Sequence, residues 1–157
     1  MARMTALILV TLALGCTPHT EPSIQDAAVL APRPRYGAVM IDVGRRFELA
    51  GKAASANRFE LAAFEVGEIQ ESFEEDLPNA ELPKEGSPQT LPAMAKGFLD
   101  LNAPELVKAA KAKDAHAFDD AFARAAAACN ACHQTSGHGF VHIPSKPGLA
   151  VPDVSPP

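Results

Sequence analysis

The segment 118–132 constrains the fold more than any other part of this sequence. Its apolar residues follow one another at steps of four, three, four and three: Phe118, Phe122, Ala125, Cys129 and Cys132. This spacing is typical of one buried face of an α-helix. We therefore expect a helix that begins after Asp114, a candidate N-cap, and ends near Gly137, with both thiols turned toward the core.

The same helix contains the motif Cys129-Asn130-Ala131-Cys132-His133, which is typical of covalent haem c attachment. In such a site each thiol forms a thioether with one vinyl group of the haem, and the histidine binds the iron. The alternatives are a redox dithiol and a zinc site made of the two cysteines with His138 and His142. A redox dithiol needs a βαβ context that is absent here, and structural zinc sites usually hold CxxC in a turn. The pattern therefore favours one covalent haem c, with His133 as the proximal iron ligand.

The sixth iron ligand stays open, and it decides between electron transfer and gas binding. Met40 lies on the expected inward face of the first helix, where its thioether would give His/Met ligation. Buried methionines mostly fill gaps in a core, and the same two interpretations apply to Met94. His142 and His138 are further candidates, because neutral imidazole is a common iron ligand. Both follow the motif closely, so we expect them on the proximal side or at the haem edge.

The first 15 residues have the pattern of a bacterial lipoprotein signal peptide. Arg3 precedes an apolar run at 6–14, which is too short to span a bilayer. Gly15 and Cys16 then match the cleavage site at which such lipoproteins are acylated on the cysteine. An ordinary signal peptide is the alternative, but it would leave a free thiol in an oxidising compartment. With Cys16 as the lipid anchor and two cysteines on haem, no cysteine of the three remains for a disulfide.

The chain divides into four parts: a signal at 1–15, a Pro-rich tether at 16–34, a helical domain at 35–143 and a Pro-rich tail at 144–157. Within the domain, apolar residues recur at helical spacing over 35–52, from Asn57 to Pro78, from Thr90 to about residue 113, and after Asp114. No alternating β pattern occurs. We therefore expect an all-α fold, a four-helix antiparallel bundle with the motif on its last helix.

Several boundaries of these helices can be predicted. Asn57 and Glu60 have the spacing of a capping box, and 77–89 is rich in proline and reads as a loop. Pro104 predicts a kink or break at 102–104 in the third stretch, whose Pro92 suits a first turn. The expected inward-facing residues of the first three stretches are Tyr36, Val39, Met40, Val43, Phe47, Ala50, Phe59, Ala62, Val66, Ile69, Phe73, Met94, Phe98, Leu101, Leu106, Val107 and Ala110.

A four-helix domain with CNACH on its final helix resembles cytochrome c prime, the class II c-type cytochromes. The resemblance covers about 35–143, and the motif is its specific part. It implies thioethers at Cys129 and Cys132, His133 on the proximal side of the iron, and a distal residue from the first helix, where Met40 lies. That family usually places a basic residue soon after the motif, whereas 134–136 here reads Gln-Thr-Ser.

The composition and charge of the chain reduce the number of function classes to consider. The formal charge of −5 argues against nucleic-acid binding, and no set of catalytic residues is recognisable, so we do not expect an enzyme. We expect a lipid-anchored, periplasm-facing protein of the bacterial envelope, at the outer membrane, that exchanges single electrons with a partner presenting a basic face. Binding of nitric oxide or carbon monoxide is the alternative, and a structural haem domain is a third. Arg45 and Arg46 are expected to pair with Glu48 and its neighbours, or else with haem propionates.

Overall fold

The computed structural model describes residues 33–83 and 90–148, which belong to one compact unit beginning at Arg33. These residues form helices and connections, with no β-strand among them beyond an isolated bridge between Arg35 and Glu81. The expected all-α class is therefore confirmed for this part of the chain. The expected signal peptide, nearly all of the tether and the end of the tail lie outside the described residues. Within 33–83 and 90–148, no helix combines the length and apolarity that crossing a membrane requires.

Helix α2 (Tyr36–Ser55) and helix α3 (Phe59–Glu71) are joined by a tight turn. The capping box predicted at Asn57 is wrong. Asn57 has a left-handed backbone with φ 58°, its N–H donates to the Ala54 carbonyl at 2.9 Å, and the Arg58 N–H donates to the Ala53 carbonyl at 2.8 Å. This pair of bonds closes the end of a helix, and asparagine tolerates the left-handed conformation better than most residues. Asn57 therefore ends α2 instead of starting α3.

The chain continues from α3 without a break through a π-helical turn, η1 (Ser72–Asp76), into the short helix α4 (Leu77–Asn79). The loop predicted from residue 77 thus begins only at Ala80. Pro78 is compatible with helix here because it lies in the first turn of α4. Phe73 of η1 is buried and meets Phe98 edge to face at 5.1 Å between ring centroids.

Helices α5 (Leu91–Leu101) and α6 (Ala103–Ala112) confirm the interruption predicted at Pro104. Pro92 and Pro104 each lie in a first turn, where the missing N–H has no partner to lose. Leu101 was expected to face inward, and that was wrong, because its side chain is 73% exposed. The break at Asn102 ends α5 before the buried stripe repeats, and burial resumes at Ala103 and Leu106.

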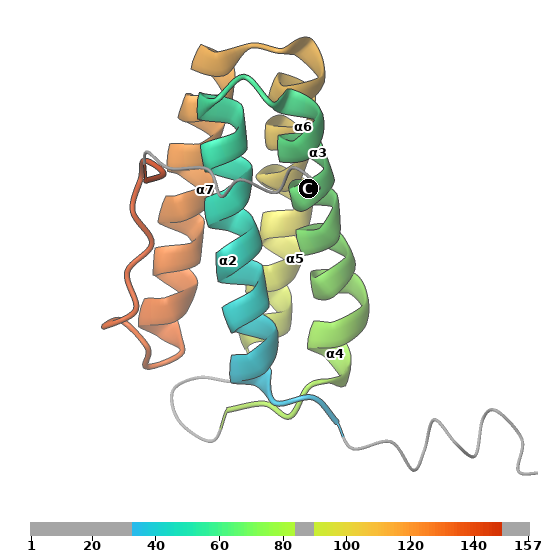
Figure 1. Ribbon diagram of the computed structural model, residues 1–157. Coiled ribbons are helices and arrows are strands. Elements are labelled where there is room, and N and C mark those ends of the chain that lie inside the picture. The colour runs from blue at the N-terminus through green and yellow to red at the C-terminus, as the bar shows by residue number, and fades with distance from the viewer. Residues whose placement is uncertain (1–32, 84–89, 149–157) are drawn as a thin grey trace, which may run out of the picture. The chain divides into compact units, whose positions relative to one another are not determined.

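Helix α7 (Ala115–Thr135) begins as predicted, with the Ala117 N–H donating to the Asp114 carboxylate at 3.0 Å. It packs against α2, α5 and α6, while α3 packs against α2 and α6, so that these helices lie side by side (Figure 1). Aromatic rings join α2 to α7, since Phe47 stacks on Phe122 at 4.2 Å between centroids. Phe118 and Ala125 of the predicted seam are fully buried, and Cys129 is partly buried against the same core.

Candidate functional site

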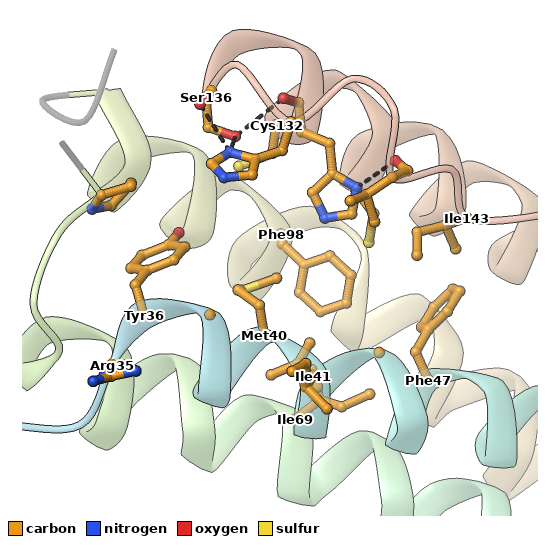
Figure 2. A pocket seen from close by; sticks show the side chains of 18 of the residues that line it. Arg35, Tyr36, Met40, Ile41, Phe47, Ile69, Phe98, Cys132, Ser136 and Ile143 are labelled. Atoms are coloured by element: carbon orange, nitrogen blue, oxygen red, sulfur yellow. Dashed lines mark hydrogen bonds between the residues drawn. The ribbon is translucent and has the colours of Figure 1, made fainter. Parts of the chain in front are cut away.

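A cavity of about 690 Å³ separates the first half of α2 from the end of α7. Its volume lies within the range of about 300–1,000 Å³ that is usual for small-molecule and cofactor sites. Figure 2 shows Tyr36 and Met40 of α2 on one side, Cys132 and Ser136 on the other, and Phe98 between them. Most of the side chains that line it are apolar, so the cavity suits a large apolar group.

Both cysteines of the motif line this cavity, and they are free thiols. Burial, and to a smaller extent the charge of Cys132, raise the pKa of Cys129 to about 12. Burial also raises the pKa of Cys132. This surrounding disfavours thiolate, which is the form that binds zinc, and accommodates neutral sulfur, which is the form present in a thioether.

His133 lines the same cavity, and its ring is oriented by a hydrogen bond to the main chain. Its Nδ1 lies 2.9 Å from the carbonyl oxygen of Val141. A carbonyl oxygen can only accept, so Nδ1 carries the proton and donates it. In the neutral form of the ring, this hydrogen bond selects the tautomer whose Nε2 has a free lone pair, as a metal-binding histidine requires.

Val141 belongs to a segment after α7 that we call the C-terminal strap, residues 137–148. It leaves α7 at Gly137, whose φ of 80° suits glycine, and runs back alongside the helix (Figure 1). Asn130, in the middle of the motif, binds this strap twice. Its side-chain amide donates to the Ile143 carbonyl at 2.9 Å and accepts from the Ile143 N–H at 2.8 Å.

The strap and Asn130 were missed by the sequence reasoning. The segment after 137 shows no periodicity, and an asparagine between two cysteines carries no signal for a partner 13 residues away. The proline content of 144–157 favoured an extended tail, and residues 144–148 are indeed without helix or strand. Ile143 is nevertheless packed against the core, so the strap is a wall of the site.

The two candidate methionines lie at different distances from the main cavity. Met40 lines it together with His133 and also lines an adjoining hollow of about 40 Å³. Met94 lines only that smaller hollow, which the two cysteines and His133 also border. Met40 is therefore the better placed of the two to reach a group held in the main cavity.

The other histidine candidates lie on the strap, as expected for residues close behind the motif. His138 lines the cavity, and its Nδ1 is bound to the Ser136 carbonyl at 2.9 Å. His142 is exposed and is not part of the cavity wall among the described residues. Over 33–83 and 90–148, no three His, Cys, Asp or Glu side chains gather as a metal-binding group. The zinc set of Cys129, Cys132, His138 and His142 is therefore not assembled in the part of the chain described.

The neighbouring arginines of α2 have different surroundings. Arg46 contacts three carboxylates, at 2.7 Å from Asp42, 3.2 Å from Glu65 and 3.3 Å from Glu68. Arg45 is exposed, lines the cavity and has no ion pair within the described residues. The expected partner Glu48 instead pairs with Lys52 at 2.6 Å. Arg45 thus remains available for an acidic group at the cavity mouth, and Arg46 does not.

Taken as a set, the cavity residues fit a haem. Two thiols and one imidazole project from the last turns of a single helix into a mainly apolar cavity of suitable size, and Arg35 and Arg45 stand at its edge. Comparison with protein-family models, with curated proteins and with solved structures gave no match to this chain. The interpretation of the site consequently depends on its own residues. The position of Cys16 lies outside the described residues.

Proposed function

We propose that this protein is a monohaem c-type cytochrome that transfers single electrons. Its haem would be attached through Cys129 and Cys132, with His133 as the proximal ligand, on the last helix of a four-helix antiparallel bundle like that of cytochrome c prime. The observation that carries the proposal is the common cavity of the two thiols and His133, together with the hydrogen bond from His133 Nδ1 to Val141. When bound, the haem iron supplies reversible one-electron chemistry.

The chain's own residues would then control the iron's surroundings. His133 presents Nε2 because its other nitrogen is committed to the strap. Apolar side chains such as Phe47, Ile69 and Phe98 line the cavity and would shield a bound haem from water, which would lower the local dielectric and influence the redox potential. Arg45 would pair with a propionate at the mouth, where its charge is otherwise unpaired within the described residues.

For the sixth ligand we propose Met40, because it borders the cavity from α2 and faces it in Figure 2. A His/Met pair of ligands raises the reduction potential and keeps the iron low-spin, as suits an electron carrier. His142 is the weaker candidate because it does not border the cavity.

Binding of nitric oxide or carbon monoxide is the second candidate function. The observation in its favour is that α2 presents Gly37 and Gly44 on either side of Met40 along the cavity wall. A methyl group added at either glycine would meet nothing within 4 Å. These positions leave space beside α2, which a small ligand on the iron of a bound haem would need.

Optical spectra of ferric and ferrous protein, with and without carbon monoxide, test the two functions. Electron transfer with Met40 ligation predicts a low-spin spectrum that carbon monoxide leaves unchanged. Met40→Ala should then become high-spin and bind carbon monoxide, while Met94→Ala, the matched control, should keep the parent spectrum. A high-spin parent that binds carbon monoxide at once would favour the gas-binding function instead. Pigment that acidified acetone extracts from the protein would refute covalent haem, and with it both functions.

We further propose that the protein is anchored in the bacterial envelope by lipid on Cys16, faces the periplasm at the outer membrane and exchanges electrons with a partner that has a basic face. The negative formal charge of the chain supports a partner with a basic face. We assign no catalytic residues. Replacing Cys16 with Ser should release the protein from membranes, and electron exchange with the partner should slow as salt concentration rises.

A further inference from the structure

Asn130 occupies a position that the haem motif leaves free, yet its side chain is fully engaged by the strap. Both of its hydrogen bonds go to the same residue, Ile143, one to the carbonyl at 2.9 Å and one from the N–H at 2.8 Å. Two bonds from a planar amide to one residue fix its direction as well as its position, as the paired bonds between two β-strands do. Asn130 thus sets the register of the strap on α7.

This register determines where the Val141 carbonyl lies relative to His133. Residues 130 and 133 share one face of α7 and are separated by about 4.5 Å along the helix axis. Ile143 and Val141 are separated by at most about 6.6 Å of chain, which is enough to cover this distance in the opposite direction. When Ile143 is held opposite Asn130, Val141 therefore arrives opposite His133, where its carbonyl accepts the Nδ1 proton at 2.9 Å.

The start of the strap does not fix this register by itself. At the end of α7 the His138 N–H donates to the His133 carbonyl at 2.7 Å, and the Val141 N–H donates to the His138 carbonyl at 2.8 Å. These bonds determine the shape of the turn, but neither of them holds the Val141 carbonyl in position. Val141 is 40% exposed, so its side-chain packing holds it only weakly. Asn130 holds the strap on the other side of Val141, through its two hydrogen bonds to Ile143.

We propose that Asn130 is a positioning residue for the proximal ligand: it holds the strap so that the Val141 carbonyl keeps the proton on His133 Nδ1 and directs Nε2 toward the iron. The inference rests on the proposed haem site. A hydrogen bond at Nδ1 raises the basicity of the ligand, which stabilises ferric more than ferrous iron. Loss of Asn130 should accordingly raise the reduction potential and weaken the bond between iron and His133.

The test compares haem-loaded wild type, Asn130→Ala and the control Asn79→Ala. Asn79 also binds the main chain, at 2.7 Å from the Glu75 carbonyl, but it is exposed and does not line the cavity. For Asn130→Ala we expect faster hydrogen exchange at the Ile143 amide and a higher potential. In the Met40→Ala background, where the ferrous iron lacks its sixth ligand, we also expect the added Asn130→Ala change to lower the iron–histidine stretching frequency in the Raman spectrum. Loss of the hydrogen-bond partner of a metal-binding histidine typically costs tenfold or more in metal affinity. A tenfold change in the ratio of ferric to ferrous affinity corresponds to 59 mV for one electron.

The possible results separate this inference from the proposed function. If the Ile143 amide exchanges faster while the Raman frequency and potential stay unchanged, Asn130 holds the strap without positioning His133, and the inference is wrong. Unchanged exchange would mean that the double hydrogen bond is not formed, which also overturns it. Wild-type protein without covalent haem would overturn the proposed function itself. If Asn130→Ala does not accumulate, Asn130→Ser, which also lacks the paired amide, gives the same three readouts.

Discussion

Gly51 lies where α2 comes closest to α7, and replacing it with alanine should destabilise the protein. A methyl group at this position would lie 2.6 Å and 2.9 Å from two ring carbons of Phe122 and 2.7 Å from the Cβ of Pro147 in the strap. Carbon atoms in contact are about 3.5–4.0 Å apart, so the ring has to move by about 0.9 Å. Phe122 cannot move freely, because it is stacked on Phe47 at 4.2 Å and lies 6.5 Å from the ring of Phe118.

The size of the effect follows from two opposing contributions. Overpacking of this kind costs about 1–3 kcal/mol, while removal of a glycine from the middle of a helix contributes about 0.5–1 kcal/mol in the other direction. Gly67→Ala in α3 is the matched control, since its added methyl meets nothing within 4 Å. It should therefore gain the helical contribution alone. The difference between the two variants, about 1–3 kcal/mol, isolates the clash with Phe122 and Pro147.

Thermal and denaturant unfolding of the haem-loaded variants measure this difference, which corresponds to roughly 4 °C in Tm for each kcal/mol. Phe47 lines the cavity, so under the proposed function Gly51→Ala should also shift the haem spectrum slightly, whereas Gly67→Ala should not. If Gly51→Ala proved as stable as Gly67→Ala, α2, α7 and the strap would not meet at Gly51, and the described cavity wall would have to be wrong.

Two further predictions concern charged and ionisable groups. Arg46→Ala should cost about 1–3 kcal/mol in unfolding free energy, because the buried carboxylate of Glu65 loses the guanidinium at 3.2 Å. Arg45→Ala, the control, should change the unfolding free energy by less than about 0.5 kcal/mol. Equal losses in the two variants would contradict this account. In the chain without haem, burial first and the charge of Cys132 second raise the pKa of Tyr36 to about 12 from the usual 10.0. The unfolded chain therefore loses this proton first, and the stability of the chain without haem should fall as pH rises from 10 through 12. Tyr36 is the chain's one tyrosine and there is no tryptophan, so the ultraviolet absorbance of tyrosinate reports this titration directly, and a midpoint near 10 would show that the phenol is not buried.

Local sequence patterns were sufficient for most of the helices. The four- and three-residue steps of the α7 seam, the Asp114 cap and the break before Pro104 depend on residues close together in the chain, and all three are found. Asn57 was misjudged because asparagine serves both at the start of a helix and in a left-handed turn after one. Its neighbours in sequence do not distinguish the two roles, and the choice depends on how α3 packs against α2.

In the candidate site, too, only the features that depend on residues close together in the chain could be predicted from the sequence. The motif alone predicted Cys129, Cys132 and His133 as site residues, and helical spacing predicted that Met40 faces inward. All four line the cavity. The bonds from Asn130 to Ile143 and from His133 to Val141 could not be anticipated. They join α7 to a segment without periodicity, whose path is determined by tertiary contacts such as that of Ile143 with the core.

The position of exposed apolar side chains supports the assignment of the cavity independently of the motif. Six large apolar side chains are exposed in the described part of the chain, and three of them line this one cavity: Ile41, which is 76% exposed, Leu82, 48%, and Val141, 40%. Large apolar groups gathered at one place on a surface mark a site that another apolar group covers, whereas isolated ones need no explanation. Ile41 also departs from the buried stripe of α2, next to Met40. Covering it with another apolar group would be favourable, and its exposure is accounted for if the haem ring lies against this face of the helix.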